Sequence, residues 1–346
     1  MVGTRNARVL TFNCHEGYVH LLGKLGLEMD VVDGLPGRYT GRWDERMRPV
    51  PPRARLIGPG DLASGARYDA VIAHNVLDLL DARGVDAPKI LVLHVNLDAR
   101  AVEEPNGPAP AEMSRQVQQY LSLIGGIAVA VSKSKRDSWK IPCDVVRPAV
   151  DPDEWRGYEG TEAALLRVAN QVNARRARFA WSAHERIVDA LPCKLVGHNP
   201  DIAGSEASRG WDHLREMYRT HRAYVHTADP ALEDGYNLAL LEAMGTGMPV
   251  VSTRAPESPV VDGENGFLDA DPAVLHDKAR RLLTDPDLAR RLGARARECV
   301  LDEFSVSAFV SGWHSAIERA KDTFEAVRRG VQRAGVRAAH RGTAVR

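Results

Sequence analysis

The sequence predicts an α/β fold with two Rossmann-like, doubly wound lobes. The chain has 346 residues, which is the length of about two domains. Two series of short Val/Ile/Leu/Ala runs alternate with helical stretches, and continuous apolar runs are typical of strands in a parallel sheet that is covered on both faces. Repeated strand–helix units of this kind favour open, doubly wound sheets.

The first series defines a lobe that we expect over residues 1–152. Helical stretches separate several of its strands, for example at residues 112–124. Residues 34–57 are rich in Pro and Arg and are expected to form a long surface loop. The strands are predicted at residues 8–13, 29–33, 68–74, 90–95, 127–132 and 143–149.

The second series defines a lobe that we expect over residues 153–305. From Pro272 onward the pattern is helical, and residues 306–325 are expected to form a separate helix. The basic stretch 326–346 has two open interpretations, a frayed, solvated tail or a surface that touches anionic lipid. Strands are predicted at residues 165–170, 193–197, 223–227 and 249–253, with a helix at 211–221 among them.

The overall composition excludes several classes of protein. Lys plus Arg equals Asp plus Glu at 46 each, so the chain has no general positive field and nucleic acid is not an expected partner. No apolar stretch approaches the ~18 residues that a membrane span requires, and residues 1–13 lack a secretory apolar region. The four cysteines are far apart, which favours a reduced, cytoplasmic protein over a disulfide or zinc framework.

Other patterns that could carry chemistry have simpler interpretations. The sequence Asp-Pro-Asp occurs at 151–153 and 285–287, where capping of a helix start explains it better than a metal site. His20, His184 and His213 form no ligand pair on one helix and are expected as ordinary helix residues. The sequence contains neither a nucleophile-elbow motif nor a phosphate-binding P-loop.

The segment from Glu233 to Val251 places one acid, Glu242, inside an otherwise apolar helix. Asn237 is a plausible N-cap, and the free N–H groups of a helix that starts there suit a phosphate. An unpaired, buried carboxylate costs several kcal/mol, so Glu242 needs partners. A pair of sugar hydroxyls is one set of partners that would donate hydrogen bonds to both carboxylate oxygens. The alternatives are a carboxylate exposed on the helix flank or one that is paired with a nearby arginine.

Residues 234–251 resemble the acid–x7–acid segment of retaining GT-B glycosyltransferases of family four, also described as glycosyl transferases group 1. The resemblance covers most of residues 8–320. It includes two strands that end in His74 and His94, and a helix start that in the family crosses back to the first lobe. The further segments that resemble the family are 130–155, 258–272 and 304–313.

The resemblance implies a GT-B fold with a cleft between an acceptor-side first lobe and a donor-side second lobe. It also implies transfer of a hexose from a nucleotide-sugar with retention of configuration, without a cofactor or a metal. In this family pattern Glu242 holds the ribose, Asp234 contacts the sugar, and His94 borders the reacting centre. The other donor-binding residues that it suggests are Asn170, Gly197, Gly235, Tyr236, Asn237 and Leu238.

The sequence departs from the family pattern at four places. Asp234 replaces a glutamate, and Asn237 replaces a glycine. The usual Gly-Arg and Lys-Gly pair is missing, and Arg175, Arg176 and Arg178 stand in that region, of which Arg175 or Arg176 is expected to grip the diphosphate. The Gly-Gly turn after the first strand is also missing, so His15, Glu16 and Gly17 are possible cleft residues at the end of that strand.

The sequence leaves the specific substrates undefined. Family habit points to a glycan, a lipid or a small metabolite as acceptor, in a bacterial cytoplasm or at the inner face of the membrane. Two other functions stay open, a GT-B nucleotide-sugar epimerase and a non-catalytic protein that binds nucleotide-sugars. The sequence also leaves the sugar, the nucleotide base and the oligomeric state undefined.

Overall fold

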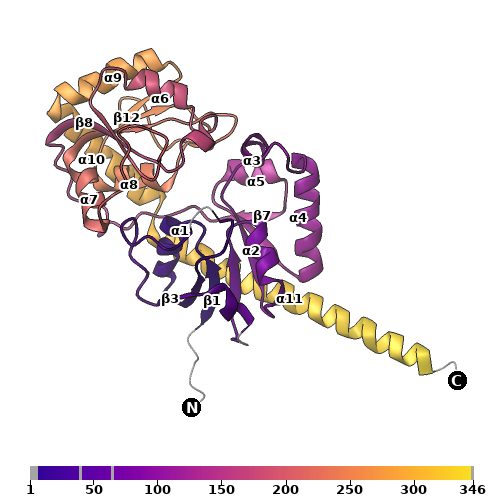
Figure 1. Ribbon diagram of the computed structural model, residues 1–346. Helices are drawn as coiled ribbons and strands as arrows, with labels where there is room; N and C mark the ends of the chain where they lie inside the picture. Colours follow the sequence, from indigo (N-terminus) through magenta and orange to yellow (C-terminus); the bar gives the residue numbers. More distant parts are fainter. Residues whose placement is uncertain (1–6, 39–40, 64–65, 344–346) are drawn as a thin grey trace.

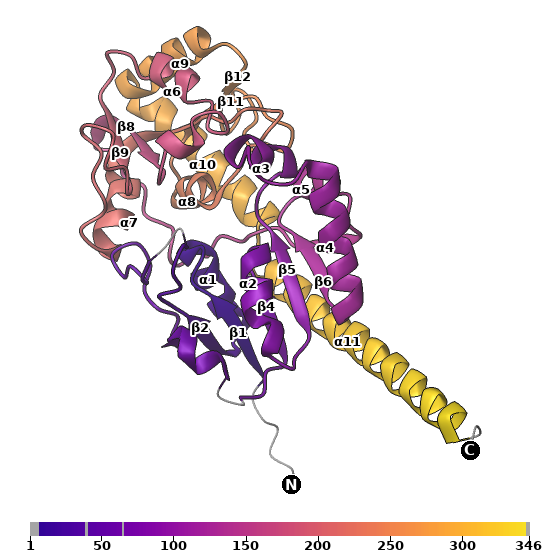
Figure 2. The same ribbon diagram turned by 45° about the vertical axis from the view of Figure 1, so that its right-hand side comes forward.

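The computed structural model describes residues 7–38, 41–63 and 66–343. The chain forms two α/β lobes, and its last long helix runs along the first lobe and projects beyond it (Figure 1). A view turned by 45° shows the same two lobes with the helices α1, α3 and α5 of the first lobe facing the second (Figure 2). The predicted α/β architecture with two lobes is confirmed.

The first lobe contains, in the described residues, a seven-stranded parallel sheet in the order β3-β2-β1-β4-β5-β6-β7. The strand order reverses between β1 and β4, and ligands of open α/β sheets bind at the carboxyl ends of the strands beside such a reversal. The strands are β1 (Arg8–Phe12), β2 (Glu28–Val32), β3 (Ala54–Ile57), β4 (Ala70–Ala73), β5 (Lys89–Leu93), β6 (Ile127–Ala130) and β7 (Cys143–Val145). The helices are α1 (Glu16–Leu22), α2 (Val76–Asp81), α3 (Leu97–Glu103), α4 (Pro110–Ile124) and α5 (Lys133–Trp139), with short 3-10 turns at Gly23–Leu25, Pro59–Ala63 and Ala82–Gly84.

The second lobe contains, in the part of the chain that is described, a five-stranded parallel sheet in the order β12-β11-β10-β8-β9. Its strands are β8 (Glu162–Val168), β9 (Cys193–Val196), β10 (His221–His226), β11 (Val250–Thr253) and β12 (Gly266–Asp269). Its helices are α6 (Trp181–Ile187), α7 (Trp211–Thr220), α8 (Leu238–Thr246), α9 (Pro272–Thr284) and α10 (Pro286–Glu303), with a 3-10 turn at Asn173–Arg175.

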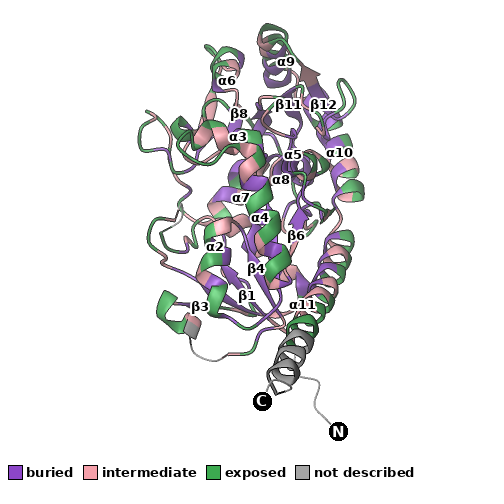
Figure 3. Cartoon of the chain, turned by 90° about the vertical axis from the view of Figure 1, so that its right-hand side faces the viewer, coloured by how far each residue is buried: buried purple, intermediate pink, exposed green. Residues whose placement is uncertain are grey.

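Each lobe has its own core, as the burial colours show (Figure 3). The last helix, α11 (Val306–Thr343), belongs to the core of the first lobe although it follows the second lobe in the sequence. Trp313 and Phe309 of this helix are at most 1% exposed and pack beside Tyr18 of α1. The predicted crossing back of the chain is therefore confirmed, and this helix ties the two lobes together.

The structure differs from the sequence prediction at three places. The stretch 34–57 was expected to be a loop, but its end forms the edge strand β3, whose middle residues Arg55 and Leu56 are exposed and so give no buried apolar run. The short strand β12 was not predicted. The helix that was expected over 306–325 is longer, because α11 continues to Thr343 through Ala- and Arg-rich sequence with good helix propensity.

The two Asp-Pro-Asp sequences have different surroundings in the structure. Asp285 caps α10 by accepting from the Leu288 N–H group, as expected. The expected helix start at Asp151 is wrong, because residues 152–154 form a turn, in which Asp151 accepts from the N–H group of Asp153. No helix in the described residues is both long and apolar enough to cross a membrane. The contact of the basic tail with anionic lipid and the cytoplasmic location stay predictions.

Candidate active site

The predicted site residues gather where the carboxyl ends of the two sheets face each other. Helix α1 starts just after β1 in the first lobe, and α8 starts at this edge of the second lobe. A Cβ atom on Gly17 would lie 3.2 Å from the Cδ1 atom of Leu238, so the starts of the two helices nearly touch. The region that the sequence singled out in each lobe is therefore one place in the structure.

The start of α8 has the cap that the sequence predicted. The Asn237 side chain accepts a 2.9 Å hydrogen bond from the Leu240 N–H group. Gly235 has a φ of +104°, and a Cβ atom there would lie 2.7 Å from that of Ala255, so only glycine fits this tight approach. The hydroxyl of Tyr236 donates to the Val131 carbonyl group of the first lobe at 2.9 Å. The turn before α8 is thus held against the first lobe.

Glu242 is 5% exposed and forms an ion pair with Arg48, which comes from the first lobe. The Tyr218 hydroxyl donates to its second oxygen at 3.3 Å. The Arg48 guanidinium also lies 4.9 Å from the ring centre of Trp211 and 5.5 Å from that of Trp155. Burial raises the pKa of Glu242, and Arg48 opposes this shift. Pairing with a nearby arginine, one of the alternatives left open by the sequence, is the arrangement found.

Asp234 is also paired with a cation from the first lobe. Its carboxylate is 1% exposed and lies 2.5 Å from the ammonium group of Lys135, at the start of α5. Burial would raise the pKa of Asp234, but the Lys135 charge lowers it overall. The other carboxylate oxygen of Asp234, Oδ1, is buried and has no hydrogen-bond partner among the described residues. Oδ1 of Asp234 is therefore the carboxylate oxygen that is open to a ligand hydroxyl.

A wider network of charges closes this side of the cleft. Arg178 lies 2.8 Å from Glu103 of α3 and 3.3 Å from Glu233. Glu257 accepts a 2.6 Å hydrogen bond from the Ser134 N–H group at the start of α5. These contacts join the second lobe to two helices of the first, and sequence spacing alone did not indicate them.

The three candidate arginines interact with different groups. The positive charge of Arg175 acts on His15 and Cys14 of the first lobe, which places Arg175 beside the cleft. Arg176 is exposed and pairs with Glu185 at 2.8 Å, while Arg178 belongs to the network described above. Of the two expected phosphate-binding residues, Arg175 is the one near the other site residues.

The loops that follow β8 and β9 contact each other. The Asn170 side chain accepts from the His198 N–H group at 2.8 Å. Gly197 has a φ of +141°, and a Cβ atom there would lie 2.1 Å from the carbonyl oxygen of Ala169. Asn170 and Gly197, two of the predicted donor-binding residues, therefore lie at the contact between these two loops.

Three histidines line the edge of the first lobe. The rings of His15 and His94 are stacked with their centres 5.6 Å apart, and His74 Nδ1 lies 2.9 Å from His94 Nε2. Burial lowers the pKa of His74 to about 3 and that of His94 well below its usual range. The surrounding protein and the Arg175 charge lower the pKa of His15 as well, although its ring remains exposed. The cluster is therefore neutral at neutral pH.

Glu16 turns toward the loop that carries Arg48 instead of toward the histidines. Its carboxylate accepts a 2.7 Å hydrogen bond from the N–H group of Asp44. Burial raises the pKa of Glu16 to about 7, with the Asp44 charge acting in the same direction. Glu16 therefore supports the position of the Arg48 loop.

The remaining candidates have structural roles. His20 lies 3.3 Å from Glu154, the His184 ring stacks on Trp181, and His213 accepts from the Arg209 N–H group. No group of three or more His, Cys, Asp or Glu residues that could hold a metal ion occurs among the described residues. The four cysteines have free thiols.

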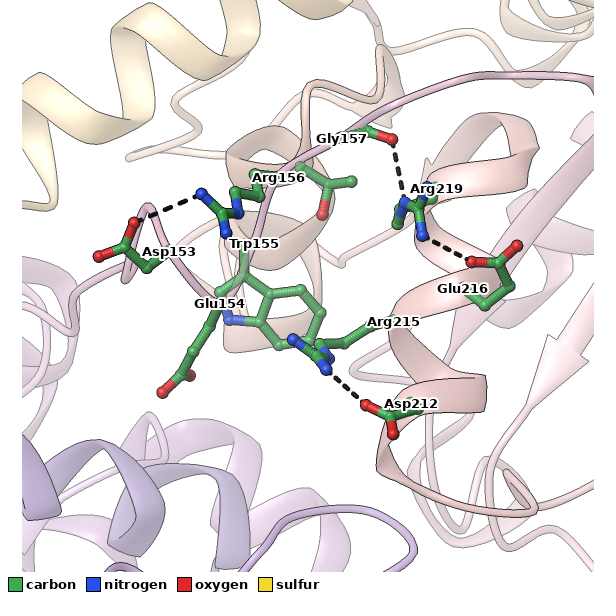
Figure 4. Close-up of a pocket in the computed structure, with 10 residues that line it drawn as sticks. Asp153, Glu154, Trp155, Arg156, Gly157, Asp212, Arg215, Glu216 and Arg219 are labelled. Atoms are coloured by element: carbon green, nitrogen blue, oxygen red, sulfur yellow. Dashed lines mark hydrogen bonds and ion pairs between the residues drawn. The ribbon is translucent and has the colours of Figure 1, made fainter.

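A pocket of about 500 Å³ lies beside Trp155, between residues 153–157 and α7 (Figure 4). Its arginines are paired with carboxylates: Arg215 lies 2.5 Å from Asp212, and Arg219 lies 2.9 Å from Glu216. None of the predicted donor-binding residues lines this pocket. We therefore place the candidate active site at the facing sheet edges and not here.

Comparison with known protein sequences finds a family match in the second lobe. Residues 165–285 match the family described as glycosyl transferases group 1. The N-acetyl-alpha-D-glucosaminyl L-malate synthase of Bacillus anthracis is 37% identical over 183 residues, which cover 46% of each chain. The trehalose synthase of Thermococcus litoralis is 30% identical over 245 residues, which cover 70% of this chain and 55% of that protein. The chain thus spans about half the length of these relatives.

Comparison with solved structures identifies the fold. The structure of Anabaena Alr3699/HepE in complex with UDP has a TM-score of 0.66 at 12% identity, over 91% of this chain and 100% of that one. The structure of a mutant of S. aureus TarM with Fondaparinux, alpha-GlcNAc-glycerol and UDP has a TM-score of 0.58 at 17% identity, over 75% of this chain and 58% of that one. The fold is GT-B, as the resemblance predicted.

The raised pKa of Glu16 predicts a pH-dependent effect on stability. The folded protein holds the Glu16 proton up to about pH 7, whereas the unfolded chain releases it near the ordinary glutamate pKa of 4.5. Stability from this group is therefore full at low pH and is lost as the pH rises from about 4.5 to about 7. Glu16→Gln keeps the acceptor for Asp44, so thermal unfolding should show a stabilised variant at pH 8 and no difference at pH 4. Equal stabilisation at both pH values would contradict the shift.

Proposed function

Because residues 165–285 match the glycosyl transferases group 1 family, we propose that this GT-B chain is a glycosyltransferase of that family. It transfers a hexose from a nucleotide-sugar to a hydroxyl group of an acceptor, with retention of configuration and without a metal or a cofactor. The relatives with transferase or synthase names and the structural neighbours with bound UDP support this proposal.

The observation that carries the proposal is the gathering of the predicted donor-site groups at one place. The capped start of α8, the charge of Arg175 and the His15–His94 pair lie along the facing edges of the two sheets. Residues from both lobes are thus available to one ligand, as transfer between a donor and an acceptor requires.

The chemistry needs positive groups at the leaving diphosphate. When the bond between the sugar and the diphosphate breaks, negative charge grows on the phosphate oxygens. The free N–H groups at the start of α8 and the Arg175 guanidinium can stabilise this charge, and one preorganised donor is worth ~3–4 kcal/mol at such a site. These groups give the chain a source of positive charge that is not a metal.

Glu242 requires an exchange of partners. With Arg48 in place, one carboxylate oxygen is already paired. We propose that the ribose diol of the nucleotide displaces Arg48 from Glu242. The Arg48 loop would then move, which would also loosen the cation–π contacts of its guanidinium with Trp211 and Trp155.

Asp234 has a matching arrangement on the sugar side. Lys135 neutralises its charge, and the unpaired Oδ1 atom can accept a hydrogen bond from a sugar hydroxyl. Since Asp234 is 1% exposed, the donor sugar reaches it only when the lobes separate slightly. Donor entry is therefore proposed to open the contacts between the lobes.

Nucleotide binding tests the role of Glu242. Glu242→Gln removes the charge at constant size and should weaken the binding of the preferred nucleoside diphosphate about tenfold or more. Arg48→Met removes the competitor and should strengthen binding by about the same factor. Titration calorimetry with UDP, GDP and ADP measures both effects, and Arg46→Met is the matched control because Arg46 is exposed and pairs with Asp44. Unchanged affinity in Glu242→Gln for all three nucleotides would sink the assignment.

A transfer assay tests the reaction and its independence of metal. Purified chain, a panel of nucleotide-sugars and a panel of hydroxyl acceptors should give a glycosylated product at the same rate with and without EDTA, since Arg175 and α8 supply the positive charge. Loss of activity with EDTA and its return with Mg²⁺ or Mn²⁺ would overturn the metal-free proposal. Conversion of the donor without an acceptor would instead indicate an epimerase, and binding without turnover would indicate a binding protein.

A further inference from the structure

A short chain of hydrogen bonds runs across the first sheet and ends at His94. The Thr11 hydroxyl on β1 lies 3.0 Å from the Ile72 carbonyl oxygen on β4 and 2.9 Å from His74 Nε2. His74 Nδ1 in turn lies 2.9 Å from His94 Nε2. Thr11 is 0% exposed and His74 is 4% exposed, so water does not compete for these bonds.

The Ile72 carbonyl oxygen is the basis on which we assign a direction to each hydrogen bond. The Ile72 carbonyl oxygen can only accept, and we assign the single hydroxyl hydrogen of Thr11 to it. The Thr11 oxygen must then accept from His74, which therefore carries its hydrogen on Nε2. A neutral imidazole has one N–H group, so His74 Nδ1 is an acceptor, and the donor to it is the Nε2–H group of His94.

The ionisable and aromatic groups around His94 agree with this assignment. His74 faces it from the end of β4, His15 from the start of α1, and Lys135 from α5, and burial together with these neighbours lowers the pKa of His94. The Tyr18 ring packs against it edge-on at 4.6 Å and brings no charge. A neutral His94 that donates through Nε2 has no hydrogen on Nδ1.

We propose that Thr11 and His74 are positioning residues, which hold His94 in the Nε2–H form so that its Nδ1 atom always accepts a hydrogen bond from a substrate hydroxyl. The identity of that hydroxyl, on the donor sugar or on the acceptor, rests on the proposed function. The fixed tautomer itself is a property of the free protein. The device makes His94 an acceptor over a wide pH range without requiring a positive or negative charge in the cleft.

The experiment is an NMR measurement of histidine tautomers in the full chain. Long-range ¹⁵N–¹H correlation spectra of ¹⁵N-histidine-labelled protein distinguish a nitrogen that carries hydrogen from one that does not. The His94 signals are assigned with a His94→Gln sample. The matched variants are Thr11→Val, which keeps the shape and removes the hydroxyl, and Thr11→Ser, which keeps the hydroxyl.

In the unmodified chain His94 should show hydrogen on Nε2 alone from pH 6 to pH 8. In Thr11→Val the buried His74 Nε2–H group loses its acceptor, so His74 should turn to its Nδ1–H form. His94 must then accept through Nε2 and carry its hydrogen on Nδ1. Thr11→Ser should retain the original form. Turnover of Thr11→Val should fall about tenfold or more relative to Thr11→Ser, with little change in KM.

A hydrogen on Nδ1 of His94 in the unmodified chain would overturn the proposal, even if Thr11→Val does not fold. An unchanged His94 tautomer in a folded Thr11→Val would overturn it as well. Because the spectra need neither a donor nor turnover, they remain decisive if the chain proves to transfer no sugar. Absence of transfer with the expected tautomers would count only against the proposed function.

Discussion

The structure depends on how two buried carboxylates are neutralised. Glu242 and Asp234 are both nearly inaccessible to water, and an unpaired buried charge would cost several kcal/mol. Each finds its cation in the other lobe, Arg48 for Glu242 and Lys135 for Asp234. The two acids that the family pattern assigns to the donor therefore also hold the lobes together when no donor is bound.

This double use links binding to the arrangement of the lobes. A ligand that offers hydroxyl groups to these carboxylates competes with Arg48 and Lys135, and removing either cation from its acid weakens a contact between the lobes. The neutral histidine cluster lies beside the same contacts, since the Lys135 charge acts on His94. Charge in the cleft is thus confined to paired groups, while the imidazoles supply neutral donors and acceptors.

The sequence predicted the parts of this arrangement that depend on local pattern. The N-cap at Asn237, the buried parallel strands and the helix that returns to the first lobe all follow from spacing or from the family resemblance. The partner of Glu242 could not be predicted, because Arg48 is 194 residues away in a stretch without a clear pattern. The separation of Arg175 from Arg176 also needed the structure, since neighbouring residues of one sequence motif can face opposite sides.

The most direct measurement is a double-mutant cycle on Arg48 and Glu242, in which chemical denaturation without nucleotide gives the free energy of unfolding of each variant. If the two form a buried pair, Arg48→Met and Glu242→Gln should each lower the free energy of unfolding by about 3 kcal/mol. The double variant should cost little more than either change alone, which gives a coupling energy of ~2–3 kcal/mol. Additive effects of the two substitutions would contradict the account, because they would mean that Glu242 does not depend on Arg48.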